Sequence, residues 1–272
     1  MIQEIDGIEF KIKEEYDFSF LAEYGKVFKV FDDQDSGNIC FGTDNGKERF
    51  FVKFAGAKTA EYDGEPIDAV NRLKSTVPIY ESLKHKYLIE YIEAKEINNG
   101  FAMIFKWANG ECMGRMYPES HKKFMALTNE IKLNVFDDIL DFVQYIADSG
   151  YVAIDFYDGS IMYDFDNRKT VICDIDFFRK SPTVNDMGRM WGSALFISPE
   201  ENLFGAVLDE ITNVYTLGAM AFALFGKYKR DLENWTLNDN LYNVAVKATN
   251  EDRSKRHQSI KAFISEWKDN NV

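Results

Sequence analysis

The chain has 272 residues, of which 46% are hydrophobic and 15% aromatic, and its 32 Lys and Arg against 45 Asp and Glu give a formal net charge of −13. This composition excludes a disordered chain, and the length allows one large domain or two smaller lobes with ample core in either case. The negative charge repels phosphate backbones, so broad nucleic-acid binding is not expected.

Cysteine content and hydropathy indicate in which cellular compartment the protein is expected. Cys40, Cys112 and Cys173 are odd in number and lack metal-ligand spacing, which favours reduced thiols over a disulfide framework or a zinc site. The N-terminal residues lack the apolar stretch of a secretory signal, and the longest apolar run, residues 214–225, is about half a membrane span. We therefore expect a soluble cytoplasmic protein with no membrane partner.

Strand-like segments separated by turn signals occupy the region from residue 18 to residue 55. Residues 27–31, 39–43 and 49–55 are rich in apolar and aromatic side chains, and the sequences between them, DDQDSGN and DNGK, are typical of tight turns. They predict an antiparallel meander. A helix is expected over residues 66–83, where apolar residues recur every three or four positions and Pro78 is placed to kink or divide it.

Two further strands, over residues 88–95 and 100–107, complete a predicted α+β lobe at residues 1–105. Residues 106–111 are expected to form a hinge, because the sequence beyond them turns helical. In the second lobe, residues 112–272, a core-facing helix is predicted over residues 131–147, whose apolar side chains form one stripe. Short strands are expected on both sides of the turn YDFDNRKT, and helices from about residue 211 onward.

Four aspartates lie in two short segments beside predicted strand ends: Asp155 and Asp158 in AIDFYDGS, and Asp174 and Asp176 in ICDIDFF. Carboxylate oxygens suit Mg²⁺, and a buried carboxylate without a partner costs several kcal/mol. The pattern is compatible with a metal or catalytic site, and also with turn and capping roles.

Lys53 lies within the predicted strand RFFVKFAG, with apolar residues on both sides. A cation at that position is expected to meet a partner or an anionic ligand, or else to extend its ammonium group to water from a strand edge. The residues around Lys53 leave both interpretations open.

Taken in order along the chain, these segments resemble the protein-kinase superfamily. FFVKFAG resembles the third-strand lysine motif, GYVAIDFYDGSIMYD the catalytic loop, ICDID the metal-binding DFG segment and GSALFISPE the end of the activation segment. The resemblance runs from about residue 27 to residue 267. It implies a bilobal kinase-like fold of the α+β class, with a small β-rich lobe and a larger, mainly helical lobe.

The resemblance also implies roles for individual residues. Lys53 would hold the α- and β-phosphates of ATP, and Asp155 would orient the acceptor hydroxyl. Mg²⁺ would be bound by Asp174, Ser160 and Asp176. The other nucleotide-binding positions are Gly37 in the phosphate-covering loop, Phe105 as gatekeeper, Lys106, Trp107 and Ala108 at the backbone that meets the adenine, and Glu111 near the ribose.

Two positions in the C-terminal half also follow the family. NVYTLG resembles the start of the buried sixth helix of the large lobe. Arg256 falls where the family has an arginine that pairs with the glutamate of the Pro-Glu step, which is Glu200 in this chain. The resemblance therefore predicts a Glu200–Arg256 ion pair.

Several positions depart from the family pattern. The covering loop DDQDSGN contains Gly37 as its one glycine and three aspartates, whose charges repel phosphate. Thr76 stands where the glutamate partner of the lysine is expected. Ser160 replaces the metal-binding asparagine, and Tyr157 stands where a protein kinase commonly has lysine.

Three functions follow from this pattern. We expect a phosphotransferase that moves the γ-phosphate of ATP, with Mg²⁺, to a serine or threonine hydroxyl of a protein substrate. A pseudokinase acting as a binding or scaffold module is the alternative favoured by Thr76, Ser160 and the missing glycines. A second alternative is a small-molecule kinase of the aminoglycoside or choline phosphotransferase type, which the Asp-Ile-Asp arrangement resembles.

Overall fold

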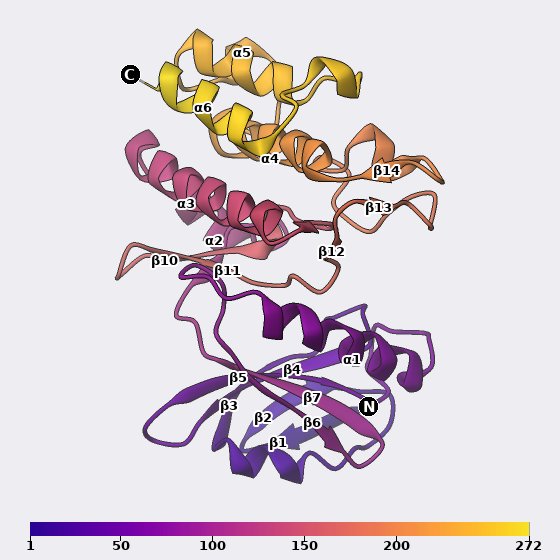
Figure 1. The fold of residues 1–272 in the computed structure, drawn as a ribbon. Coiled ribbons are helices and arrows are strands. Elements are labelled where there is room, and N and C mark those ends of the chain that lie inside the picture. Colours follow the sequence, from indigo (N-terminus) through magenta and orange to yellow (C-terminus); the bar gives the residue numbers. More distant parts are fainter. Residues whose placement is uncertain (272) are drawn as a thin grey trace. The chain divides into compact units, whose positions relative to one another are not determined.

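The computed structural model describes residues 1–271, and the chain divides into two compact units (Figure 1). Unit 1 comprises Met1–Lys84 and Ile89–Asn109, and unit 2 comprises His85–Leu88 and the chain from Gly110 onward. The described residues contain a β-rich sheet region and six α-helices, which is compatible with the expected α+β class.

A five-stranded antiparallel sheet in the order β3-β4-β5-β7-β6 forms the centre of unit 1. The predicted meander is confirmed to within one residue at each strand end. β6 begins later than predicted because residues 85–88 belong to unit 2, where Leu88 forms a parallel bridge with Ile172. The strands are β3 (Lys26–Phe31), β4 (Asn38–Asp44), β5 (Arg49–Ala55), β6 (Tyr91–Ile97) and β7 (Gly100–Lys106).

The N-terminal segment covers the sheet face that is opposite to Lys53. β1 (Ile2–Ile5) and β2 (Ile8–Lys11) form a hairpin, and the 3-10 turn η1 (Ser19–Glu23) follows. None of these elements was predicted from the sequence, although the Asp6-Gly7 turn, with φ of 54° and 87°, is a strong hairpin signal. One buried cluster joins this segment to the sheet through Phe10, Phe18, Leu21, Phe41, Val52 and Phe54.

The helix α1 (Pro66–Ser82) packs on the other sheet face, which carries Lys53. The ring of Tyr80 lies 5.0 Å from that of Phe105, between centroids, and Met103, the register partner of Lys53, contacts α1 through its sulfur. Pro78 lies within the helix, which continues from Pro66 to Ser82, so of the two expected effects, a kink or a division, the division does not occur.

Unit 2 is mainly helical. α3 extends the predicted helix over residues 131–147 at both ends, and its N-terminus is capped by Thr128, whose side chain accepts from the N–H of Ile131. α4 is buried along almost its whole length and packs against α3, α5 and α6. The helices are α2 (Pro118–Met125), α3 (Asn129–Asp148), α4 (Glu210–Phe225), α5 (Asp239–Ala248) and α6 (Ile260–Asn270).

Short antiparallel strands carry the loops of unit 2. The pair β10 and β11 confirms the strands expected on both sides of YDFDNRKT. Within residues 1–271, none of the helices combines the length and the apolar character needed to cross a membrane. The strand pairings are β11 (Lys169–Ile172) with β10 (Ile161–Asp164) and β10 with β8 (Glu111–Cys112), β9 (Tyr151–Val152) with β12 (Arg179–Lys180), and β13 (Thr183–Val184) with β14 (Val207–Leu208).

Candidate functional site

Two loops of unit 2 carry the aspartates singled out in the sequence. Asp155 follows β9 and precedes the 3-10 turn η2 (Asp158–Ser160), whereas Asp174 follows β11. The loops meet because β10 and β11 are paired and the N–H of Cys173 donates to the carbonyl of Ser160 at 2.9 Å. The fold therefore brings Ser160 beside the residue that precedes Asp174.

Asp155 and Asp174 share an unusual backbone conformation. Their φ angles are 57° and 58°, in the left-handed region that residues other than glycine rarely adopt. Conformations of this kind cost of the order of 1–3 kcal/mol and concentrate at functional sites, where the surrounding structure holds them. The two candidate carboxylates thus belong to residues whose strained backbone conformation the surrounding structure has to stabilise.

A side chain from α4 anchors the backbone just before Asp155. The amide of Asn213 accepts from the N–H of Ala153 at 2.8 Å and donates to its carbonyl at 2.7 Å. Asn213 is buried, so these bonds satisfy polar groups that water cannot reach. Asn213 is part of the segment NVYTLG, but its anchoring role was not predicted from the sequence. An asparagine in a buried apolar helix is nevertheless a signal, because its amide needs a partner.

We expect Asn213→Leu to lower the free energy of unfolding by about 2 to 4 kcal/mol, because each backbone group of Ala153 left unpaired in the interior costs about 1–3 kcal/mol. Urea denaturation measures this change. Asn243→Leu, at an exposed position of α5, is the matched control and should alter stability by less than about 0.5 kcal/mol. Equal effects of the two substitutions would contradict the anchoring role.

The phenol of Tyr157 lies among the candidate carboxylates. Burial raises the pKa of Tyr157, and the charges of Asp155 and Asp174 raise it further. Burial also raises the pKa of the Cys112 thiol to about 11, with contributions from Asp158 and Asp174. Both groups are therefore neutral at physiological pH, and the surrounding carboxylates form a negatively charged region that suits a cation.

Asp158 has a structural partner. It is buried, and its Oδ2 accepts from the hydroxyl of Tyr228 at 2.5 Å. Burial raises the pKa of Asp158, and Tyr228, His121 and Arg115 partly offset that effect. The guanidinium of Arg115 lies 4.4 Å from the centroid of the Tyr228 ring. Asp158 thus fixes η2 to the segment that follows α4.

Ser160 and Asp174 carry oxygen atoms of the kind that Mg²⁺ binds. Ser160 is 1% exposed, and its Oγ has no hydrogen-bond partner among the described residues, so its oxygen is available to a ligand. Mg²⁺ commonly binds one or two carboxylates together with substrate phosphates. The carboxylate of Asp174 is exposed and follows β11, the strand that pairs with β10, which begins directly after Ser160. Within residues 1–271, no group of three or more His, Cys, Asp or Glu side chains could hold a metal by itself. Asp176 lies two residues after Asp174, in the loop before β12.

In unit 1, Lys53 lies on β5 between Cys40 of β4 and Met103 of β7. On α1, the buried Thr76 donates its hydroxyl to the carbonyl of Leu73 at 2.8 Å, and its Oγ1 lies 3.1 Å from the sulfur of Met103. The helix position that faces the strand neighbour of Lys53 therefore carries an uncharged side chain, which cannot form an ion pair with the lysine.

Gly37 is buried where the loop after β3 meets α1. Its φ is 80°, and a Cβ at this position would lie 2.7 Å from the ring of Tyr62 and 2.8 Å from Ala69. Arg72 of α1 donates to the carbonyl of Ser36 at 2.7 Å. Close packing and a left-handed backbone thus require glycine at position 37, independently of any phosphate.

The remaining nucleotide-binding candidates lie at the end of β7 and in the residues that follow it. Phe105 is 2% exposed, and the N–H groups of Lys106 and Trp107 donate at 2.9 Å to the carbonyls of Glu90 and Arg49. A ligand at this segment would therefore use the carbonyls or the N–H of Ala108. Glu111 belongs to unit 2, where it forms an ion pair with Lys123.

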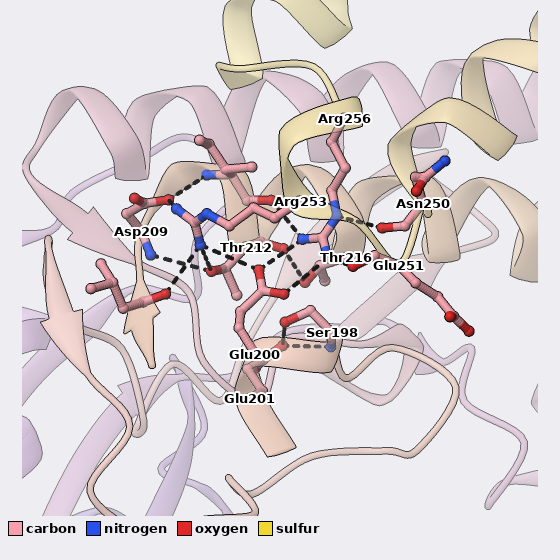
Figure 2. Close-up of polar contacts among 12 residues, drawn as sticks. Ser198, Glu200, Glu201, Asp209, Thr212, Thr216, Asn250, Glu251, Arg253 and Arg256 are labelled. Carbon is pink, nitrogen blue, oxygen red and sulfur yellow. Dashed lines mark hydrogen bonds and ion pairs between the residues drawn. The ribbon is translucent and has the colours of Figure 1, made fainter. Parts of the chain in front are cut away.

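The predicted Glu200–Arg256 ion pair is confirmed (Figure 2). Nη1 and Nη2 of Arg256 donate to the two carboxylate oxygens of Glu200 at 2.7 and 2.9 Å. The side chain of Arg256 is 0% exposed and that of Glu200 is 8% exposed. Burial raises the pKa of Glu200, but the hydrogen bonds and charge of Arg256 outweigh burial and hold it below its usual value. Arg253 adds contacts to Glu200 and Asp209.

Comparison with known proteins gives a distant relationship. No family model matches the chain. The chain is similar to the dual specificity protein kinase zak2 of Dictyostelium discoideum, with 19% identity over 188 residues, which cover 60% of this chain and 29% of that protein. This supports a kinase-like relationship. The identity is too low, and the matched share of the relative too small, to carry over the activity or the substrates of the whole kinase.

Proposed function

We propose that this chain is a kinase-like phosphotransferase that moves the γ-phosphate of ATP to a serine or threonine hydroxyl of a protein, with unit 1 as the small lobe and unit 2 as the large lobe. The observation that carries this proposal is the pair Asp155 and Asp174. Both have left-handed backbones, and they lie in hydrogen-bonded loops that also hold the unpartnered buried hydroxyl of Ser160.

Each residue has a defined task in this mechanism. Asp155, behind the Asn213 anchor, orients the acceptor hydroxyl and accepts its proton as the new O–P bond forms and the bond between the γ-phosphorus and the departing oxygen of ADP breaks. Lys53 neutralises charge on the phosphates. Asp174 and Ser160 would hold Mg²⁺, which when bound offsets charge on the phosphate oxygens. Phosphoryl transfer needs mainly this positioning and charge stabilisation from the protein.

The test is transfer of labelled γ-phosphate from Mg·ATP by the wild type and by Asp155→Asn, with basic proteins and, separately, small alcohols as acceptors. We expect label on serine or threonine of the protein acceptors and a loss of about 100-fold or more in Asp155→Asn, because a positioned base contributes at least this factor. Asp166→Asn, at an exposed position between β10 and β11, is the matched control and should keep the wild-type rate.

The acceptor that is labelled separates the candidate functions. Label on a small alcohol alone would assign the chain to the small-molecule phosphotransferases. The distant relative is named a dual specificity kinase, so phosphotyrosine is assayed alongside phosphoserine and phosphothreonine. Equal transfer by the wild type and Asp155→Asn would contradict the role of Asp155.

A nucleotide-binding module without turnover is the second candidate. It is favoured by Thr76, whose uncharged side chain faces Met103 beside Lys53, where active kinases supply a glutamate for the lysine. Binding of Mg·ATP by the wild type, with no transfer to any acceptor, would support this function over the enzyme.

A further inference from the structure

Exposed cations lie beside Tyr228 in unit 2. Three of them belong to the turn that follows α4, and the fourth, Arg115, lies between β8 and α2 with its guanidinium 4.4 Å from the centroid of the Tyr228 ring. Among residues 1–271, none of the four forms an ion pair with a carboxylate. Their charges are therefore available to an anionic ligand. This cationic surface consists of Arg115, Lys227, Lys229 and Arg230.

The turn that carries Lys227 and Lys229 has a constrained backbone. Lys227 and Tyr228 have φ angles of 51° and 64°, so two successive residues other than glycine adopt the left-handed region. The N–H of Lys229 closes the turn by donating to the carbonyl of Gly226 at 2.9 Å, and the hydroxyl of Tyr228 donates to Asp158 at 2.5 Å. Because such conformations persist only where the surrounding structure holds them, the two lysines have a fixed place on the protein.

Two contacts connect the cationic surface to the loop of Asp155. The hydrogen bond to Asp158 reaches η2, three residues after Asp155. Arg230 donates to the carbonyl of Leu195 at 3.3 Å. Leu195 lies three residues after Gly192, and a Cβ on Gly192 would lie 3.5 Å from Oδ1 of Asp155. A protein segment whose hydroxyl group reaches Asp155 therefore passes close to these cations.

The cationic surface contrasts with the rest of the chain, whose net charge is −13. Such a protein repels an acidic partner over most of its surface and attracts it where cations gather. The acid that follows in the sequence, Asp231, is engaged, because its Oδ1 accepts from the N–H and the side-chain amide of Asn234 at 2.9 and 2.7 Å. Charge complementarity mainly determines which partner is accepted, so this surface favours an acidic segment over a basic one.

We propose that the acceptor serine or threonine lies within an acidic protein segment, and that Lys227 and Lys229 bind carboxylates of this segment. Arg115 and Arg230 add positive charge beside the turn. Exposed ion pairs are individually weak, so the preference arises from several carboxylates that meet several cations. The inference rests on the proposed function, which supplies a protein acceptor, and it adds the chemical class of that acceptor.

The experiment compares three peptides of equal length that carry one serine, flanked by glutamate, glutamine or lysine. Fluorescence anisotropy on the full chain measures their dissociation constants, and labelled γ-phosphate from Mg·ATP measures transfer to them. We expect the wild type to bind the glutamate peptide about fivefold or more tightly than the glutamine peptide, because opposite charges attract. Salt at about 0.5 M should remove most of this difference, since it screens exposed charges.

A double variant tests the two lysines. Lys227→Gln with Lys229→Gln should bind the glutamate and glutamine peptides within about twofold of each other, because the cations nearest Tyr228 in the sequence are gone. Lys169→Gln with Lys261→Gln is the matched control, since it removes the same charge from exposed positions of β11 and α6. The control should keep the preference of the wild type. An equal loss in both double variants would assign the preference to net charge and overturn the role of the turn.

The peptide series of the wild type tests the inference even if the variant at the turn fails to fold. Binding of all three peptides within about twofold of one another, or tighter binding of the lysine peptide, would overturn the acidic acceptor. The phosphotransfer proposal would still stand if label reached the serine. Preferential binding of the glutamate peptide without transfer of label to any peptide would count against the proposed function, and would support the cationic surface as a site for acidic segments.

Discussion

Arg256→Met is expected to lower the free energy of unfolding by about 3 to 5 kcal/mol, because it leaves the buried charge of Glu200 without its main partner. The arginine side chain is fully buried and donates to both carboxylate oxygens at 2.7 and 2.9 Å. Among charged partners, Arg253 would remain near Glu200, with its Nη1 3.4 Å from one oxygen. The carbonyl of Asn250 would also lose a donor, at 2.7 Å. Urea denaturation followed by circular dichroism measures the loss.

A double-mutant cycle with Glu200→Gln isolates the contribution of this pair. The combined variant should lose at least about 1 kcal/mol less than the sum of the single variants, because glutamine leaves no unpaired charge behind. Lys58→Met is the control for an exposed pair, since Lys58 and Glu14 are 48% and 64% exposed, and should cost less than about 1 kcal/mol. A loss in Arg256→Met as small as in this control would contradict the importance of the buried pair.

The strands of unit 1 were predictable because turn sequences bound short apolar and aromatic segments. The face of each side chain was harder to predict, since β5 has apolar or aromatic residues on both faces: Val52 and Phe54 pack in the core with the N-terminal segment, whereas Phe51 faces the same side as Lys53. The hairpin of β1 and β2 covers the face that carries Val52 and Phe54. Because this hairpin was not predicted, the sequence did not show which residues of β5 face the core.

Part of the candidate site was predictable for a different reason. The Glu200–Arg256 pair was predicted from the order of motifs in a family that the chain resembles, because that order records a contact between distant residues. Asn213 lies in the segment NVYTLG, whose resemblance to the family does not name a partner for it, and Tyr228 lies in none of the quoted motifs. Their partners Ala153 and Asp158 lie 60 and 70 residues away along the chain. A polar residue in a buried helix indicates that a partner must exist, but only the fold identifies that partner.

Gly37 was predicted to cover phosphate, and Thr76 was identified as a departure from the family pattern; both residues have packing roles in the structure. A single glycine in a short loop fits a phosphate-covering role, yet the ring of Tyr62 and the side chain of Ala69 already require glycine there. The resemblance aligns Thr76 with a charged residue of the family, and the structure gives its hydroxyl local partners in Leu73 and Met103. Residue identity alone does not distinguish a packing requirement from a ligand contact.

The stability of the chain is expected to depend on pH through Glu201, which lies beside the Glu200–Arg256 pair (Figure 2). Burial raises the pKa of Glu201 to about 7, although the N–H and hydroxyl of Ser198 donate to its Oε2 at 2.7 and 2.8 Å. The folded chain therefore binds this proton more tightly than the unfolded chain, whose glutamate has the ordinary value of 4.5. The stability from this group is complete below pH 4.5 and is lost as the pH rises through 7, and it amounts to about 3 kcal/mol.

Glu201→Gln removes this titration while its amide oxygen can still accept from Ser198. The free energy of unfolding of the variant, minus that of the wild type, should rise by about 3 kcal/mol between pH 4.5 and pH 8, because only the wild type loses the bound proton. Glu233→Gln, at an exposed position in the 3-10 turn η4 (Leu232–Asn234), should give a flat difference over the same range. A flat difference for Glu201→Gln as well would mean that the carboxyl of Glu201 is already ionised in the folded chain at pH 4.5.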